Sequence, residues 1–464
     1  MTEETRRMIG KLKSGKAGGV CEIQGEMLKA GGEVIVEWLT AICNTVWRLG
    51  VTPREWRRAV IIPIHKKGNR RDCKNYRGIS LLSVPGKVFA RILNDRMRCK
   101  TEGKIMEEQV GFRPGRGCTE NVFVIRQLGE KMLERGKKLY AAFLDLEKAY
   151  DRVWREGLWR ALEQYGVEGR LLRAIQSLYQ DSEAAVKVGE EITDWFQVER
   201  GVRQGCPMSP WLFNIYLDVV MKEALPLFKG GANLNNCQIQ VTMFADDTVL
   251  LAESEEDLKW NVEKLYEAMK RHRMKVNWSK SNTMVISRVP TECNIEMDGE
   301  KVKNVREVVY LGVKLSEDGK MGSEVERRIG MTMQTVGAMK KVYESRDLSR
   351  EAKVTVFEAV AVPTLTYGCE SWVLKEREKS RLQATEMRVL RKIAGVTRMD
   401  RIRNETVRER LGVESVLEKV ERRRECWKEK VECKKGSVVE KVMTGEGVGR
   451  RPRGRPRKRW RDRF

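Results

Sequence analysis

Phe244-Ala245-Asp246-Asp247 is the stretch that decides the fold of this 464-residue chain. It lies between two apolar runs, residues 239–243 (IQVTM) and 248–251 (TVLL). Both runs are rich in β-branched residues and partly alternate, which predicts two strands joined by a tight hairpin turn. Adjacent carboxylates repel each other, and a divalent cation, which prefers oxygen ligands, is the usual reason to place them together. For an isolated pair the alternative is an ordinary solvated turn.

A second acidic position far upstream favours the cation-binding interpretation over an ordinary solvated turn. Asp145 ends another apolar run, residues 141–144 (AAFL), and a helical pattern follows it. Two carboxylate sites at strand ends can meet on neighbouring strands of one sheet. Together they would hold two divalent ions roughly 4 Å apart, one beside an attacking oxygen and the other beside a leaving oxygen. This layout is typical of phosphoryl transfer.

A loop between these two sites carries a third signal. Residues 201–210 (GVRQGCPMSP) place glycines and prolines around Arg203 and Gln204, and an apolar helical pattern, residues 211–215, follows. Such a loop indicates a backbone that passes close to another group. The alternative is a proline-stopped turn before a core helix.

In this order and spacing, the segments resemble the active-site motifs of a reverse transcriptase, and specifically those of LINE-type (non-LTR) retrotransposons. The resemblance extends over about residues 10–315. Further segments that are similar to motifs of this family occur at residues 60–68 (VIIPIHKKG), 75–82 (NYRGISLL), 109–119 (QVGFRPGRGCT), 275–281 (KVNWSKS) and 310–313 (YLGV).

The resemblance implies an α+β fold with right-hand polymerase architecture. The palm would be built on an antiparallel sheet flanked by helices, between fingers and a helical thumb. The implied domains are residues 1–138 (N-terminal lead and fingers), 139–315 (catalytic palm), 316–400 (thumb) and 401–464 (charged C-terminal extension with a basic tail). Such proteins usually carry an endonuclease domain before the fingers, and we expect this chain to represent the polymerase region without it.

The family's metal site transfers to three positions of this chain. Asp145 and Asp246 would ligate two Mg²⁺ ions, for which Mn²⁺ can substitute, and Asp247 would be the least tightly engaged ligand. Glu147 lies outside the implied site. Asp151 is six residues beyond Asp145, and we expect it to cap or pair locally.

The substrate contacts transfer in the same way. Tyr150 matches the aromatic gate that in this family lies beneath the sugar of the incoming nucleotide and would select deoxynucleotides. Without the motif, the interpretation would be an aromatic residue that faces the core. Gln204 and Gly205 match the loop that packs on the incoming nucleotide and the template base.

Cations would hold the triphosphate of the nucleotide. Lys66 and Arg77 match the phosphate-binding cations of the fingers, although Lys66 and Lys67 could exchange roles. Lys280 matches the lysine that would protonate the leaving pyrophosphate; the alternative is one more surface lysine in a basic chain.

The implied function is an RNA-directed DNA polymerase that adds dNTPs to the 3′-hydroxyl of a DNA primer on an RNA template. One alternative is a catalytically retired nucleic-acid-binding protein derived from such an element. A two-metal nuclease is a third hypothesis, but it would require a further cluster of acidic or histidine ligands that the sequence does not offer.

Composition agrees with a nucleic-acid partner. The chain has 90 Lys and Arg against 66 Asp and Glu, a formal charge of +24, and such proteins bind the phosphate backbone. No apolar run is long enough to span a membrane, and the N-terminus lacks a secretory signal. The eleven cysteines show no paired spacing, which indicates reduced thiols. We therefore expect a protein of the nucleus or cytoplasm that is neither secreted nor inserted in a membrane.

The C-terminal region is strongly charged. Residues 418–430 predict a solvated amphipathic helix followed by a linker, and the tail, residues 450–459 (RRPRGRPRKR), is basic. Its Arg453, Arg455 and Arg457 are candidate nucleic-acid contacts that would reach chromosomal DNA. We favour non-specific tethering to nucleic acid through phosphate contacts. The alternatives are a nuclear localisation signal and an AT-hook, which the Arg-Gly-Arg-Pro core resembles and which reads a narrow minor groove. At the other end of the chain, Val34, Trp38 and Ile42 mark a predicted helix.

Overall fold

The runs on either side of Asp246 form a β-hairpin, as predicted. The computed structural model describes residues 1–453 and 458–463, and in it β9 (Val241–Phe244) pairs antiparallel with β10 (Asp247–Ala252). β10 also pairs antiparallel with β3 (Leu139–Leu144), which ends one residue before Asp145. The predicted acidic sites therefore meet at the same end of adjacent strands.

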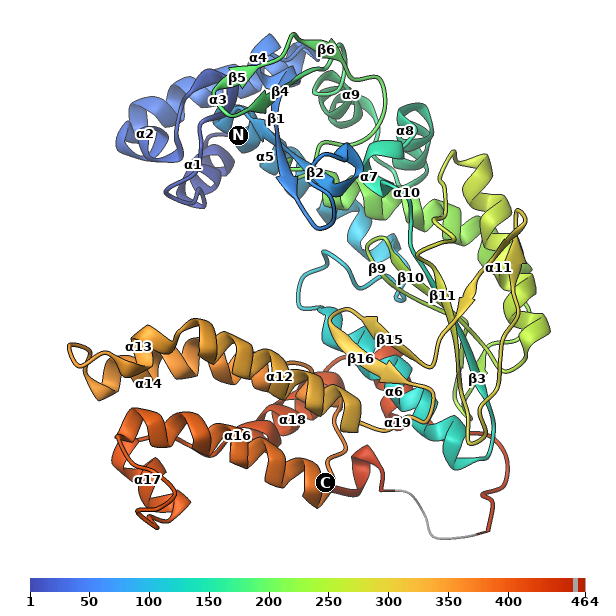
Figure 1. The fold of residues 1–464 in the computed structure, drawn as a ribbon. Helices are drawn as coiled ribbons and strands as arrows, with labels where there is room; N and C mark the ends of the chain where they lie inside the picture. Colours follow the sequence, from blue (N-terminus) through green and yellow to red (C-terminus); the bar gives the residue numbers. More distant parts are fainter. Residues whose placement is uncertain (454–457, 464) are drawn as a thin grey trace.

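These strands belong to a five-stranded sheet with the order β14-β11-β3-β10-β9. β11 (Asn282–Ile286) is antiparallel to β3, while the short edge strand β14 (Lys303–Asn304) is parallel to β11. The sheet is thus antiparallel, as predicted, except at one edge. It lies between two outer lobes of the molecule (Figure 1).

Both faces of this sheet are covered, because residues of β3 alternate between two cores. Tyr140, Ala142 and Leu144 pack in a core that includes α10 (Ser209–Ala224) and α11 (Glu255–Arg271). The intervening residues pack with α6 (Cys118–Glu134) in a second core on the opposite face. Side chains of a strand alternate between faces, and a sheet buried on both sides explains why β3 reads as an unbroken apolar run.

The N-terminal lobe contains a second sheet. β1 (Arg58–His65) pairs antiparallel with β2 (Tyr76–Leu82) and parallel with β4 (Glu183–Val188). Two short strands, β5 (Glu191–Ile192) and β6 (Phe196–Gln197), extend from β4. This sheet therefore joins chain segments that lie before and after β3.

Helices surround the second sheet. They are α1 (Thr2–Gly10), α2 (Gly25–Ala30), α3 (Gly32–Leu49), α4 (Arg54–Arg57), α5 (Val84–Thr101), α7 (Ala149–Arg152), α8 (Arg155–Gln164) and α9 (Gly169–Ser177). The predicted helix around Trp38 is α3. The three residues that marked this helix in the sequence lie on its exposed face. Val34, Trp38 and Ile42 are all exposed, and Trp38 is 67% accessible. A parallel stripe that includes Leu39 and Cys43 is the buried one.

The third lobe is helical (Figure 1). It contains α12 (Gly322–Ala338), α13 (Lys340–Glu344), α14 (Arg350–Val356), a π-helical turn (Phe357–Ala361), α15 (Val362–Thr366), α16 (Glu376–Ala394), α17 (Asn404–Leu411) and α18 (Val416–Glu432). Val407 of α17 packs in one core with α16, and Val420 of α18 packs in another with Leu382.

A hairpin connects the central sheet to the helical lobe. It consists of β15 (Glu307–Tyr310) and β16 (Val313–Ser316), which pair antiparallel. Its turn is held from the helical lobe, because the Tyr367 hydroxyl donates to the carbonyl of Leu311 at 2.9 Å and Arg328 donates to the carbonyl of Gly312.

The segment after α18 is more ordered than a linker, which corrects the prediction. α19 (Val438–Thr444) packs on α6, where buried Lys131 donates to the carbonyl groups at the C-terminal end of α19. Farther along, Trp460 is 2% exposed and packs edge-on against Phe123 of α6, with ring centroids 4.9 Å apart. The predicted helix itself is confirmed as α18, although it also buries Trp427. None of the helices in the described residues is long and apolar enough to cross a membrane.

Candidate nucleotidyl-transfer site

The catalytic hairpin turns at Ala245, and a buried glutamine holds that turn. Ala245 has a positive φ of 57°, a conformation that costs energy for residues other than glycine. Gln109 compensates with its side-chain amide: Oε1 accepts from the Ala245 N–H at 2.9 Å, and Nε2 donates to the Ala245 carbonyl at 3.3 Å. The position of the neighbouring Asp246 therefore depends on a residue in a distant loop.

The backbone of that loop presses directly against the turn. A Cβ atom on Gly111 would lie 2.3 Å from the Ala245 nitrogen, so only glycine fits. Gly111 also donates its N–H to Gln109 Oε1 at 3.0 Å, and its carbonyl accepts from Asn214 Nδ2 of α10 at 2.7 Å. In the sequence, residues 109–119 are similar to a motif of the family, but these contacts of Gln109 could not be foreseen. The only hint was Gly111, because a glycine often marks a place where two backbone segments approach closely.

Asp145 is fixed by the loop that carries Lys280. The Asp145 N–H donates to Ser281 Oγ at 3.1 Å, and the Asp145 carbonyl accepts from the Asn277 N–H at 2.8 Å. On balance the pKa of Asp145 is raised, first by burial. The positive charge of Lys280 opposes this rise, the negative charge of Asp246 adds to it, and Lys66 opposes it more weakly. Both predicted cations therefore act on the predicted metal ligand.

Asp247 differs from its neighbour. Burial raises the pKa of Asp247 to about 6, and the negative charges of Asp246 and then Asp145 add to the rise. Part of the residue nevertheless remains exposed to solvent, and water at such a surface screens part of an electrostatic effect. The Asp247 carboxylate therefore takes up a proton more readily than an ordinary aspartate.

The two aspartates of the hairpin act on opposite faces of the sheet. Asp246 raises the pKa of Tyr150, which packs against the core containing α10, after the larger contribution of burial. Asp247 acts in the same direction on Tyr310, a member of the other core, where burial again dominates. Side chains of successive residues entering a strand diverge in this way.

Within residues 1–453 and 458–463, no three His, Cys, Asp or Glu side chains converge tightly enough to form a ready-made metal site. Asp145, Asp246 and Asp247 are also without ion-pair partners among the described Lys and Arg residues. Asp145 and Asp246 thus remain as unpaired carboxylates that repel each other, and a bound cation would relieve that repulsion.

Tyr150, the predicted aromatic gate, packs against helix α10. Its ring stacks on Phe213 of α10, with centroids 4.9 Å apart and planes 14° from parallel. Its phenol is influenced by Asp246 and by Arg77, the first raising and the second lowering its pKa. The ring is therefore held between the carboxylates and the N-terminal lobe.

Gln204 and Gly205 bridge to strand β2. The Gln204 carbonyl accepts from the Ser80 N–H at 2.7 Å, and Gln204 Oε1 accepts from Arg77 Nε at 3.2 Å. Gly205 has a φ of 130°, and a Cβ atom there would lie 2.5 Å from the Ser80 carbonyl oxygen. This close approach explains the glycine that follows Gln204. Lys66 and Lys67, in the turn between β1 and β2, are both exposed.

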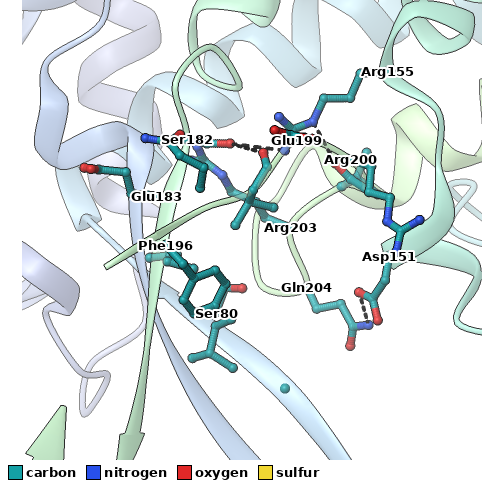
Figure 2. Close-up of a pocket in the computed structure, with 18 of the residues that line it drawn as sticks. Ser80, Asp151, Arg155, Ser182, Glu183, Phe196, Glu199, Arg200, Arg203 and Gln204 are labelled. Carbon is teal, nitrogen blue, oxygen red and sulfur yellow. Dashed lines mark hydrogen bonds between the residues drawn. The ribbon is translucent and has the colours of Figure 1, made fainter. Parts of the chain in front are cut away.

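A large cavity lies beside this loop, away from the acidic residues. It has a volume of about 760 Å³ and is bounded by β1, β2, β4, β6, α8 and the loop before Gln204. Asp145, Asp246 and Asp247 do not line it, whereas Gln204 and Asp151 stand at its edge (Figure 2).

The described part of the basic tail lies in a different place from this site. Arg453 lines a separate cavity of about 390 Å³ with Arg126 and Glu134 of α6. Its neighbour Arg451 pairs with Glu134. Arg455 and Arg457, the other predicted nucleic-acid contacts of the tail, lie outside the described residues.

The chain is similar in sequence to several known proteins. The family model described as reverse transcriptase (RNA-dependent DNA polymerase) matches residues 64–315. The RNA-directed DNA polymerase from mobile element jockey of Drosophila melanogaster is 24% identical over 470 residues, which cover 98% of this chain and 50% of that protein. A probable RNA-directed DNA polymerase from transposon X-element of the same species is 26% identical over 468 residues, with the same coverage.

A more distant similarity exists to a solved structure. Telomerase from Candida Tropicalis, in complex with a TWJ fragment of telomeric RNA, has 15% sequence identity and a TM-score of 0.42, and the match covers 89% of this chain and 68% of that one. This chain spans about half the length of the curated relatives it matches. The α+β fold, with its carboxylate-bearing sheet between two outer lobes, confirms the predicted right-hand polymerase architecture. Because the family match covers more than half of the sequence, the chain belongs to the reverse transcriptase (RNA-dependent DNA polymerase) family.

Proposed function

We propose that this protein is an RNA-directed DNA polymerase of a non-LTR retrotransposon, which extends a DNA primer on an RNA template. The observation that carries the proposal is the pair Asp145 and Asp246. These carboxylates stand at the paired ends of adjacent strands and repel each other, and neither has an ion-pair partner among the described residues. The positive charges of Lys280 and, more weakly, Lys66 act on Asp145.

The residues present fit a divalent-metal site. Asp145 and Asp246 would hold two Mg²⁺ ions, or Mn²⁺ in their place, with Asp247 as the weaker third contact. The remaining ligands would be substrate phosphate oxygens and water, as is common for Mg²⁺. When bound, the metal would lower the pKa of the attacking hydroxyl and offset charge on the leaving oxygen.

The chain's own residues would position the nucleotide. Lys66 and Arg77 would bind the triphosphate of a dNTP, Tyr150 would lie beneath its sugar, and the Gln204–Gly205 loop would pack on its base and on the template base. The primer 3′-hydroxyl then attacks the α-phosphate, and the bond to the β-phosphate breaks. Lys280, which lies near Asp145, would donate a proton to the departing pyrophosphate. Fixed charges of this kind stabilise the charge that develops in the transition state.

The nucleic acid would be held by the basic surface of the chain. Its formal charge of +24 favours binding to an RNA template and a DNA primer. We extend the proposal to the basic tail, where Arg453, Arg455 and Arg457 would contact chromosomal DNA. We also propose a nuclear or cytoplasmic location, where these substrates occur. For the domains we propose the boundaries given by the sequence, with the palm at residues 139–315, of which β4 (Glu183–Val188) joins the sheet of the N-terminal lobe.

Primer extension tests the proposal. Purified protein is supplied with poly(rA), oligo(dT), dTTP and Mg²⁺, next to an Asp246→Ala, Asp247→Ala double variant. Extension by the wild type alone supports the proposal. Failure of both proteins, with binding of the hybrid intact, would instead identify a nucleic-acid-binding protein that has lost catalysis.

A further inference from the structure

The carboxylate of Asp151 reaches across to the Gln204 loop instead of pairing locally, which corrects the prediction for this residue. Its Oδ1 accepts a hydrogen bond from Gln204 Nε2 at 3.1 Å, between residues 53 positions apart in the chain. Figure 2 shows the two side chains facing each other at the edge of the large cavity. Asp151 belongs to the short helix α7, which also carries Tyr150.

The two partners of Gln204 determine which way its amide points. A carboxylate only accepts hydrogen bonds and a guanidinium only donates them. The NH₂ group must therefore face Asp151, and the amide oxygen must face Arg77, whose Nε lies 3.2 Å from it. A flipped amide would lose both bonds and would place donor against donor at Arg77. Asp151 thus selects the orientation in which Gln204 can bind Arg77.

Backbone contacts keep Asp151 in place relative to this loop. The Gly201 N–H donates to the Val153 carbonyl at 2.8 Å, and the Val202 N–H donates to the Tyr150 carbonyl at 2.9 Å. Gly201 has a φ of 83°, and a Cβ atom there would lie 2.9 Å from backbone atoms of Asp151. The loop therefore lies directly on α7, and the carboxylate needs no large movement to reach Gln204.

We propose that Asp151 is a positioning residue for the incoming nucleotide. It holds the Gln204 amide so that its oxygen orients the guanidinium of Arg77 toward the triphosphate. The relay links α7, the Gln204 loop and strand β2. This inference rests on the proposed function, because it assigns Arg77 to the triphosphate, and it adds a residue that touches neither the metal ligands nor the reacting atoms.

The test compares five variants in steady-state extension with dTTP as the varied substrate. Asp151→Ala is expected to raise the KM for dTTP about three- to tenfold, the range that corresponds to one hydrogen bond, with little change in kcat. Asp151→Asn keeps a side-chain oxygen that accepts from Gln204 and is expected to recover most of the loss. Glu199→Ala removes an exposed carboxylate at the same cavity and is the matched control, with an unchanged KM.

The last two variants, Gln204→Ala and the double variant Asp151→Ala, Gln204→Ala, separate a relay from a structural effect. If Asp151 acts through Gln204, Asp151→Ala has no further effect on KM in a Gln204→Ala background, because the partner is already absent. An undiminished effect in that background, or an unchanged KM in Asp151→Ala itself, overturns the inference.

A binding measurement keeps this test distinct from that of the proposed function. If the wild type extends no primer, the proposed function fails, and the inference is judged by equilibrium binding of dTTP to the protein–hybrid complex in Ca²⁺. The positioning role is supported if Asp151→Ala binds dTTP more weakly than the wild type, and if the same substitution makes no difference to dTTP binding in the Gln204→Ala background. Equal binding by wild type and Asp151→Ala overturns it.

Discussion

The side-chain amide of Gln109 brackets the backbone of Ala245, accepting from its N–H at 2.9 Å and donating to its carbonyl at 3.3 Å. Gln109 is fully buried, and Ala245 lies in the turn between β9 and β10. One glutamine therefore supports the left-handed residue that sets the place of Asp246. The geometry of the acidic site is thus a long-range property of the fold.

Replacing Gln109 by Ala should weaken both folding and catalysis. The substitution leaves a buried N–H and a buried carbonyl without their partner, which costs about 1–3 kcal/mol of unfolding free energy. Urea denaturation measures this loss, and primer extension measures the accompanying fall in kcat. Gln164→Ala, at an exposed position, is the control. Equal stability of the two variants would show that the turn does not depend on Gln109.

Tyr150 should determine which sugar is accepted. Tyr150→Val shortens the side chain beneath the proposed sugar position, so a ribose 2′-hydroxyl no longer meets the ring. We expect discrimination against UTP relative to dTTP, measured as the ratio of kcat/KM values, to fall roughly tenfold or more. Incorporation of dTTP by the same variant serves as the internal control. An unchanged ratio would show that Tyr150 does not select between ribose and deoxyribose.

The raised pKa of Asp247 predicts a pH-dependent stability. Its folded-state value of about 6 lies above the ordinary value of about 3.9, so ionisation is less favourable in the folded protein. This contribution to stability is fully present below about pH 4 and is lost as the pH rises through 6. In EDTA, Asp247→Asn should therefore stabilise the protein near pH 7 and change it less near pH 4.5.

Urea unfolding at the two pH values checks this expectation. An effect of Asp247→Asn that is similar at both would contradict the expected direction of the pH dependence. Added Mg²⁺ provides a second comparison, because a cation bound beside Asp247 would stabilise the wild type near pH 7 more than the variant.

Trp460 should join the helical lobe to the central sheet. Its ring packs on Phe123 of α6, and its Nε1 donates to the Glu370 carbonyl of the helical lobe at 2.7 Å. Trp460→Ala is expected to cost about 3–5 kcal/mol of unfolding free energy and to shorten the products of a single binding event. Trp38→Ala, at a tryptophan that is 67% exposed, should change neither. Equal effects of the two substitutions would show that Trp460 does not join the helical lobe to the central sheet.

Much of the acidic site was predictable because its signals are local. The apolar runs beside Asp246 and before Asp145 predicted strand ends, and the family resemblance predicted that they would meet. The contacts of Gln109, Asp151 and Trp460 were not predictable, since each depends on a partner far away in the chain. The sequence also did not decide which face of α3 is buried, for a related reason. Its two apolar stripes are similar in sequence, and only the packing of the surrounding helices decides which one is buried.

Single-nucleotide addition to a DNA primer on an RNA template, measured by rapid quench in Mg²⁺, tests the metal-binding role of Asp145. Asp145→Asn keeps the shape of the side chain but removes the charge that would bind the metal, while Asp194→Asn makes the same change at an exposed position. We predict addition by the wild type and by Asp194→Asn, and at most a trace by Asp145→Asn with hybrid binding unchanged. Addition by Asp145→Asn at the wild-type rate would contradict the assignment of Asp145 as a catalytic metal ligand.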